Sequence, residues 1–402
     1  MRTRHGSVRP FALLSGGGTA GHVQPALAVG EALVARGHER SSIDYVGSRR
    51  GMEGRLVPEA GFQVTLLPGR GIQRRLALEN LGAAAGLAAA CVLAVAMLIR
   101  RRPRVVVTVG GYAGLPCALA AILLRVPLVV VSYDAVPGTA NRIVARFARK
   151  CAVAFEASSL PNQVVTGAPL RSSVLEADRS PQGRVAARAA IGVPEDRFLL
   201  AVAGGSLGAR RLNDATVGLA RSWASRDDLA IYHVTGERNL ALIEAEAASV
   251  GLGRKDPSGA AGVNASGTGP GTATQTGLEY RVVGYEKKMP ALLAACDLAV
   301  CRAGASTVAE LAAIGTPSVL VPLPGAPHDH QTRNAEALTR LGAAVLLKDG
   351  DCTAERLSEL VASLVGQPSR LAAMGAAAVA AGHRDAADRV AALVESVAEG
   401  VA

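Results

Sequence analysis

The chain has 402 residues, of which half are hydrophobic, 19% are charged and 45 are glycine. This composition excludes a disordered protein, and the glycines lack the three-residue period of collagen. The length allows two domains of ordinary size, each with its own core. The net charge of +10 is uneven, because residues 1–175 hold 21 Lys and Arg against 8 Asp and Glu, whereas residues 176–402 hold 22 against 25. The first half is therefore expected to meet an anionic partner, such as nucleic acid, phospholipid headgroups or a phosphorylated lipid.

Short runs rich in Val, Ile and Leu alternate with longer Ala- and Leu-rich stretches along the chain. Continuously apolar strands separated by helices are typical of parallel sheets that are covered on both faces. The runs form two sets, which predicts two doubly wound α/β domains. The expected strands are residues 11–15, 42–47, 63–67, 104–109, 127–132 and 151–155, then 198–203, 229–234, 280–283, 297–301, 317–321 and 343–347.

A glycine-rich turn, residues 16–22 (GGGTAGH), follows the first expected strand. Its spacing fits G-x-G-x-x-G, the fingerprint of dinucleotide-binding folds, which also requires an acidic residue at the end of the second strand. Residues 45–48 (YVGS) occupy that end, and Asp44 lies within the strand, so the fingerprint is incomplete. The turn predicts main-chain N–H groups near a polar or anionic ligand without identifying the ligand.

Residues 81–99 contain no charged side chain and are followed by arginines at positions 100, 101, 102 and 104. A membrane span needs ~20 apolar residues and often has a positive flank. Eight of these nineteen residues are Ala and two are Gly, however, and such small side chains favour insertion only weakly. We therefore expect a helix that is partly buried in the first domain and lies against a bilayer with its arginines near the headgroups.

The domain boundary is expected near residues 167–175, where a proline-containing link precedes a polar helix. Residues 1–168 would form the N-terminal domain and residues 169–383 the C-terminal domain. Residues 254–278, rich in Gly, Ser, Thr and Ala without periodicity, predict a flexible insertion. Residues 384–402 have apolar positions at helical spacing and predict a terminal helix.

Two further glycine-containing turns in the second half each follow an expected strand: residues 204–210 (GGSLGAR) and residues 301–310 (CRAGASTVAE). In the latter, Ser306 or Thr307 is expected to cap a helix whose free N–H groups face a diphosphate, with Glu310 accepting hydrogen bonds from a ribose diol. The alternative is an ordinary capping box in which Glu310 is the partner of the cap.

The motifs together carry a family resemblance that no single motif would support. They are residues 17–22 (GGTAGH) with 25–28 (PALA), 110–112 (GGY), 137–138 (PG) with Asn141, 204–210 with Asn213, and 301–310. In this order, and over nearly the whole chain, they resemble the motifs of the MurG family, the UDP-N-acetylglucosamine transferases that convert lipid I to lipid II in peptidoglycan synthesis. The resemblance implies an α/β GT-B glycosyltransferase fold, with two Rossmann-like doubly wound domains facing a central cleft.

The resemblance also implies substrate contacts. The second domain would bind the sugar nucleotide through Arg171 and Ser206, through the helix N-terminus that begins at residues 305–308, and through Glu310 at the ribose. Gln331 would contact the GlcNAc hydroxyls, and residues 285–286 the uracil base. The expected substrate-binding residues are Thr19, Ala20, Gly21, Asp134, Arg171, Ser206, Tyr285, Glu286, Ala305, Ser306, Thr307, Val308, Ala309, Glu310 and Gln331.

The implied transfer inverts the anomeric centre by direct displacement, which needs a base for the acceptor hydroxyl and positive potential on the leaving UDP. His22 is the expected catalytic base, because an imidazole with a pKa of ~6.5 can take a proton at neutral pH. The alternative is a structural histidine of the loop. No metal or other cofactor is expected, and residues 349–351 (DGD), which resemble a metal-binding D-x-D motif, are expected to form a turn.

This chain departs from the family pattern at two places. Ala20 stands where members commonly have Gly. A His-Glu-x-Asn segment of the family is replaced by residues 131–134 (VSYD), so that Asp134 puts an acidic group where an amide is expected to face donor and acceptor. We expect this change to alter acceptor or sugar preference, or to reduce activity.

The sequence is therefore compatible with three functions: a lipid II-forming transferase, a MurG-like paralogue with another lipid or secondary-metabolite acceptor, and a noncatalytic UDP-sugar-binding membrane scaffold. His22 and Glu310 argue against the scaffold. The expected partners are UDP-GlcNAc, an undecaprenyl-diphosphate-linked acceptor and an anionic membrane surface. No nucleic acid is expected, because the positive charge falls on the domain that would meet the lipid. The expected location is peripheral, at the cytoplasmic face of the cell membrane.

Overall fold

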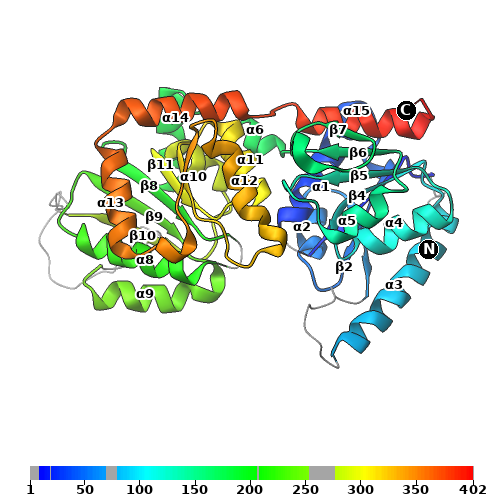
Figure 1. The fold of residues 1–402 in the computed structure, drawn as a ribbon, viewed down its shortest axis with the longest axis horizontal. Helices are drawn as coiled ribbons and strands as arrows, with labels where there is room; N and C mark the ends of the chain where they lie inside the picture. Colours follow the sequence, from blue (N-terminus) through cyan, green and yellow to red (C-terminus); the bar gives the residue numbers. More distant parts are fainter. Residues whose placement is uncertain (1–8, 19, 69–78, 206–207, 253–276, 402) are drawn as a thin grey trace, which may run out of the picture. The chain divides into compact units, whose positions relative to one another are not determined.

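The structure is a computed structural model that describes residues 9–18, 20–68, 79–205, 208–252 and 277–401. The chain divides into two compact units, each built on its own parallel sheet (Figure 1). The first unit comprises Met1–Leu175, Ala326–Arg333 and His383–Ala402, and the second comprises Glu176–Gly325 and Asn334–Gly382. The predicted insertion lies outside the described residues, apart from residues 277 and 278.

The first sheet has seven parallel strands in the order β3-β2-β1-β4-β5-β6-β7. The order reverses between β1 and β4, and in doubly wound sheets ligands bind beyond the carboxyl ends of the strands at such a point. The glycine motif at residues 16–22 lies at the carboxyl end of β1, and the one at residues 110–112 lies at the carboxyl end of β4. The strands are β1 (Ala12–Gly17), β2 (Ile43–Ser48), β3 (Gln63–Leu67), β4 (Val105–Gly111), β5 (Leu128–Ser132), β6 (Lys150–Val153) and β7 (Gln163–Val165).

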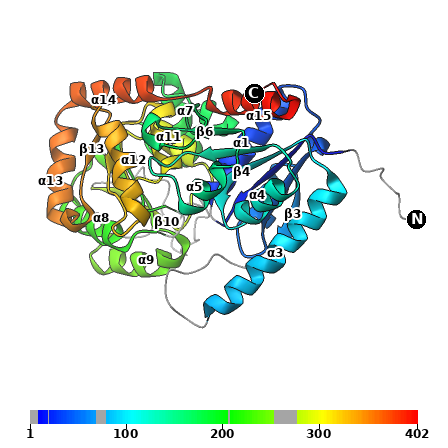
Figure 2. The same cartoon turned by 45° about the vertical axis from the view of Figure 1, so that its right-hand side comes forward.

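Helices cover this sheet, and one core is formed by the sheet with α3 and α4, around Leu13, Leu98, Val106, Cys117 and Val130. Figure 2 shows the long α3 beside α4. The helices are α1 (Ala20–Ala35), α2 (Glu53–Glu59), α3 (Glu79–Arg101), α4 (Gly114–Leu123), α5 (Thr139–Ala145), α6 (Ser172–Leu175) and α15 (Ala386–Glu399), with 3₁₀ turns at Arg40–Ser42, Glu156–Ser158 and Pro327–Asp329.

Helix α3 contains the uncharged segment and buries one side only. Ala90, Ala94 and Leu98 are buried, whereas Val92 is 69% exposed. At its end Arg101 pairs with Asp44 at 2.8 Å, which anchors the helix to β2. In the part of the chain that the structure describes, no helix is long and apolar enough to cross a membrane.

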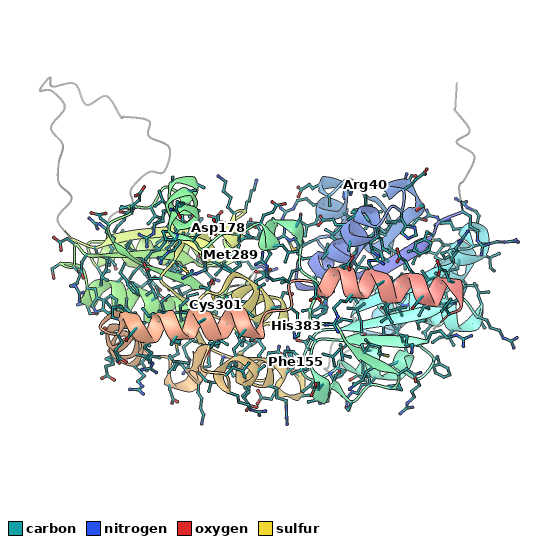
Figure 3. The ribbon with its side chains drawn as sticks, turned by 90° about the horizontal axis from the view of Figure 1, so that it is seen from above. Arg40, Phe155, Asp178, Met289, Cys301 and His383 are labelled. Carbon is teal, nitrogen blue, oxygen red and sulfur yellow. The ribbon has the colours of Figure 1, made fainter. Side chains whose placement is uncertain are left out.

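The predicted terminal helix is α15, and it packs on α1 of the first unit. Arg36 pairs with Asp388 at 2.8 Å and with Glu395 at 2.9 Å, and His38 lies 3.0 Å from Glu395. At the start of this segment, a Cβ on Gly167 would lie 2.3 Å from Cβ of His383, which is labelled in Figure 3. The last segment of the chain therefore completes the first unit.

The second sheet has six parallel strands in the order β10-β9-β8-β11-β12-β13. The strands are β8 (Phe198–Ala203), β9 (Leu229–Val234), β10 (Glu279–Val283), β11 (Leu298–Cys301), β12 (Ser318–Leu320) and β13 (Ala344–Leu346). Its helices are α7 (Pro181–Ile191), α8 (Arg210–Ser222), α9 (Leu240–Ser249), α10 (Met289–Ala295), α11 (Ala305–Ile314), α12 (His330–Thr339), α13 (Ala354–Val365) and α14 (Pro368–Ala381), with 3₁₀ turns at Glu237–Asn239 and Asp349–Asp351.

All twelve predicted strands are present, and the prediction of two doubly wound parallel sheets is confirmed. The additional strand, β7, was not predicted. Its three residues, Gln163–Val165, are only partly buried at the edge of the first sheet. A strand this short and mixed in polarity lacks the apolar run that identifies the others.

Candidate active site

The first glycine loop joins β1 to α1, and close packing explains its glycines. Gly17 has φ +151°, and a Cβ there would lie 1.7 Å from Oε1 of Glu53. Gly111, at the end of β4, has φ +74°, and a Cβ there would lie 2.1 Å from the carbonyl oxygen of Gly17. A side chain at either position would clash or be strained. The backbones of β1 and β4 are therefore in direct contact at the ends of the two strands. Of the predicted residues in this loop, Ala20 begins α1 and Thr19 lies outside the described residues.

The buried carboxylate of Glu53 fixes the first glycine loop through a hydrogen bond to its backbone. Oε1 of Glu53, at the start of α2, accepts hydrogen bonds from the backbone N–H groups of Gly18 and Ser48, both at 2.9 Å. The hydroxyl of Tyr45 donates to the carbonyl oxygen of Gly16 at 3.2 Å. Glu53 was not predicted, because its only signal in the sequence is an acidic residue in a glycine-containing turn after β2. The Gly18 N–H group therefore donates to a carboxylate of the chain itself and is not available to bind an anionic ligand.

His22 lies in the first turn of α1. Its Nδ1 atom is hydrogen-bonded to the hydroxyl of Tyr133, and that hydroxyl also donates to the carbonyl oxygen of Gly21 at 2.8 Å. Burial lowers the pKa of His22, while the charges of Asp134 and Glu53 raise it and His330 lowers it. The structure thus brings His22, Gly21 and Asp134 together and adds Tyr133, which was not among the predicted site residues.

Two predicted donor-binding residues lie on short segments of the first unit. Arg171 immediately precedes α6, and Gln331 is the second residue of α12, whose residues 330–333 belong to the first unit and whose residues 334–339 belong to the second. The turn before α12 places His328 at φ +55°, and Nε2 of His328 lies 2.8 Å from Nη2 of Arg142. A hydrogen bond from Thr332 to Asp329 at 2.7 Å closes the first turn of the helix.

Three residues, 302–304, separate Cys301, the last residue of β11 (labelled in Figure 3), from the start of α11 at Ala305. Its N-cap is Gly304 in an extended conformation, and no side chain caps it. The predicted cap at Ser306 or Thr307 is therefore wrong, because both lie inside the first turn. The capping-box alternative is excluded as well, since Glu310 stands six residues after the cap. An N-terminus without a side-chain cap favours an anion through the helix dipole.

Arg302, the first residue of this turn, is a buried arginine whose polar contacts fix the turn in place. Arg302 is 9% exposed, pairs with Asp349 at 2.6 Å, and donates to the carbonyl oxygens of Val321 and Pro322 at 3.1 Å. Asp349 also lies 3.4 Å from Arg211. The predicted turn at residues 349–351 is a 3₁₀ helix. Among the described residues, no group of His, Cys, Asp and Glu could hold a metal ion.

The glycine turn after β8 is packed against a buried polar network. A Cβ on Gly208 would lie 2.2 Å from both Asn239 and the carbonyl oxygen of Thr235. His233 is fully buried between Tyr280, 2.8 Å from its Nδ1, and Asn213, 3.0 Å from its Nε2. Burial lowers the pKa of His233 to about 3, so this histidine is neutral. Ser206, predicted to contact the nucleotide, lies outside the described residues.

The predicted uracil-binding pair follows the carboxyl end of β10. Tyr285 is 37% exposed, as a residue that stacks on a base requires. The Glu286 carboxylate accepts hydrogen bonds from the Tyr232 hydroxyl and, at 2.6 Å, from the backbone N–H of Lys288. The Glu286 carboxylate therefore stabilises the turn that follows β10.

Comparison with known proteins identifies relatives along the whole chain. Residues 12–153 match the N-terminal domain of glycosyltransferase family 28, and residues 199–390 match its C-terminal domain. A Nocardioides protein named UDP-N-acetylglucosamine–N-acetylmuramyl-(pentapeptide) pyrophosphoryl-undecaprenol N-acetylglucosamine transferase is 41% identical over 95% of this chain and 96% of its own length. A protein of the same name from Acidothermus cellulolyticus is 39% identical over 96% of this chain and 97% of its own. The crystal structure of Acinetobacter baumannii MurG is 26% identical, with a TM-score of 0.68 over 96% of this chain and 99% of that one.

Proposed function

The chain belongs to the MurG family, and on that premise we propose that it moves GlcNAc from UDP-GlcNAc to the 4-hydroxyl of MurNAc in undecaprenyl-diphosphate-linked lipid I, giving lipid II. The observation that carries the proposal is the environment of His22. A histidine whose pKa is lowered by burial lies beside a glycine loop at the strand-order reversal of the first sheet. A neutral imidazole at such a place is suited to take a proton from an acceptor hydroxyl.

In the proposed step the MurNAc 4-hydroxyl oxygen attacks C1 of GlcNAc from the face opposite the diphosphate. The new C–O bond forms as the bond from C1 to the diphosphate oxygen breaks, and UDP leaves with the electron pair. The hydroxyl proton passes to Nε2 of His22. The product is β-linked because displacement inverts the α-linked carbon. Asp134, whose charge raises the pKa of His22, would stabilise the imidazolium that forms.

The leaving diphosphate needs positive potential, which we assign to the N-terminus of α11. Residues 305–309 would approach the phosphates through backbone and small side chains, and Glu310, one turn further on, would hold the ribose. Arg171, Ser206, Tyr285, Glu286 and Gln331 remain the proposed contacts to the rest of UDP-GlcNAc. Residues 19–21 would lie beside the acceptor. No cofactor enters this scheme.

The activity is tested with purified protein, UDP-GlcNAc and a short-chain lipid I analogue, by following UDP release together with product mass. We expect UDP release that depends on the acceptor, and a product heavier by one GlcNAc. UDP-GlcNAc without acceptor measures background hydrolysis. Donor binding without turnover would refute the proposal and favour a scaffold.

The residues at 132–134 favour a second candidate, a paralogue with another lipid or secondary-metabolite acceptor. Asp134 brings a negative charge near His22, where a diphosphate-linked acceptor would be repelled. An acceptor panel in the same assay decides between the two. Lipid I analogue used at least as well as neutral lipid alcohols supports the first candidate, and preference for an uncharged acceptor supports the second.

We also propose that the first unit binds an anionic membrane surface on the cytoplasmic side. A hollow of about 570 Å³ lies where β5 and β6 begin, and its lining includes Arg125, Arg146, Arg149 and Lys150 but no acidic residue. Phe147, which also lines the hollow, is 62% exposed, and Leu123, adjacent in sequence to the lining residue Ile122, is 69% exposed. Exposed apolar side chains beside several cations suit a layer of anionic headgroups, where each Lys or Arg contributes about 1 kcal/mol.

The arginines predicted to lie near headgroups at the end of α3 stay part of this proposal: Arg101 pairs with Asp44, whereas Arg100, Arg102 and Arg104 are exposed. Sedimentation with vesicles of phosphatidylcholine, with and without phosphatidylglycerol, tests the surface. The double change Arg146→Ser and Arg149→Ser should weaken binding to anionic vesicles about tenfold or more and reduce its salt dependence. The matched double change Arg356→Ser and Arg370→Ser, in the second unit, should leave binding unchanged. Equal binding by the two variants would refute the assignment.

A further inference from the structure

Tyr133 joins His22 to the glycine loop through one hydroxyl group. The residue directly follows β5 and is only 5% exposed. Its hydroxyl is hydrogen-bonded to Nδ1 of His22 and lies 2.8 Å from the carbonyl oxygen of Gly21. All three residues belong to the first unit. Tyr133 is also part of the segment in which this chain departs from its family's pattern.

The two hydrogen bonds determine which nitrogen of His22 carries the proton. A tyrosine hydroxyl has a single proton to donate, and a carbonyl oxygen can only accept. The hydroxyl proton therefore points to Gly21, and the bond to His22 requires Nδ1 to be the donor. Hydrogen-bond geometry thus assigns neutral His22 the tautomer with its proton on Nδ1. The lone pair of Nε2 is then available to accept a proton.

The charges around His22 are consistent with this arrangement. Burial lowers the pKa of His22, so the imidazole is neutral near pH 7. The groups that act on it are the carboxylates of Asp134 and Glu53, which raise its pKa, and His330, which lowers it. Burial also raises the pKa of Tyr133 well above 10, so its hydroxyl keeps its proton.

We infer that Tyr133 is a positioning residue that holds His22 in the tautomer required of a general base; this rests on the function proposed above. During transfer the acceptor proton moves to Nε2 while the Nδ1–H remains bonded to the Tyr133 oxygen. Without that oxygen, the tautomer protonated on Nε2, which predominates in free neutral histidine, would compete. His22 in that form cannot accept the acceptor proton on Nε2.

Kinetics with Tyr133→Phe test the role, since the phenyl ring keeps the packing and only the hydroxyl is lost. We expect kcat to fall about tenfold, the loss of one hydrogen bond to the base, with KM for both substrates within about twofold. The acidic limb of the pH profile of kcat should move to lower pH, because the imidazolium loses an acceptor. The control is Tyr45→Phe, which removes a hydroxyl bonded to Gly16 of the same loop without touching His22. It should leave the acidic limb in place.

Nitrogen-15 NMR of histidine-labelled protein reads the tautomer directly, with the His22 signal assigned from His22→Asn. At pH 8 we expect a protonated Nδ1 and a bare Nε2 in the unchanged protein, and a shift toward protonated Nε2 in Tyr133→Phe. A protonated Nε2 in the unchanged protein, or the same tautomer and kcat in both proteins, would overturn the inference. The measurement needs no turnover. Absent GlcNAc transfer with the expected tautomer would therefore refute the proposed function and leave the tautomer assignment standing.

Discussion

Asp349→Asn removes one charge from the buried pair with Arg302 while keeping the size of the side chain. The two side chains are 10% and 11% exposed and lie 2.6 Å apart. Leaving one member of a buried pair without its partner costs about 3–5 kcal/mol. Arg302 keeps the carbonyl oxygens of Val321 and Pro322, so we expect a value at the lower end, about 3 kcal/mol.

Trp223 makes the assay specific for the second unit. It is the chain's single tryptophan, is 8% exposed, and belongs to the core of that unit. Its fluorescence during urea unfolding follows this unit alone. With a denaturant slope of about 3 kcal/mol per M, the loss corresponds to a midpoint lower by about 1 M.

The matched control is Glu359→Gln, which breaks a pair with Arg356 whose side chains are 67% and 59% exposed. A pair this exposed contributes about 0.5 kcal/mol or less, so its midpoint should move by less than about 0.2 M. Midpoints for Asp349→Asn and Glu359→Gln that agree within error would refute the reasoning. Transfer activity that needs a divalent metal and is lost in Asp349→Asn would instead revive residues 349–351 as a metal site.

Three further outcomes follow from the structure. His22→Ala should lower kcat about 100-fold or more, and a loss of less than a few-fold would rule out His22 as the base. In the unchanged protein, the acidic limb of the pH profile of kcat/KM should lie below pH 6.5, because burial lowers the pKa of His22. His233, with a pKa of about 3, stays neutral in the folded unit, whereas the same side chain in the unfolded chain takes a proton below about pH 6.5. The free energy of unfolding of the second unit should therefore fall by about 2 kcal/mol between pH 6.5 and pH 5. Urea unfolding followed by Trp223 fluorescence should show this pH dependence in the unchanged protein and not in His233→Gln. Gly111→Ala should lower the free energy of unfolding by about 2 kcal/mol or more in circular dichroism melts, whereas Gly82→Ala, with open space around its Cβ, should not; equal melts would contradict the packing argument.

The sheets could be predicted because their strands are long apolar runs, and the family because its motifs are local in sequence. Glu53 and Tyr133 could not be selected, since each acts through a contact with a distant part of the chain, and the departure at residues 131–134 drew attention to Asp134. Side-chain chemistry alone predicts the cap of α11 at Ser306 or Thr307. The extended backbone of Gly304 starts the helix earlier than that chemistry suggests.

The return of α15 to the first unit affects the order in which the protein can be completed during synthesis. Residues 9–175 leave the ribosome first, but α1 then lacks the apolar face of Val390, Val394 and Val397 and the ion pairs of Arg36. The first unit thus begins to form early and is completed only after the whole second unit has been made. A truncation that removes residues 386–402 would therefore damage the first unit, whose larger part, residues 1–175, precedes the whole second unit in the sequence.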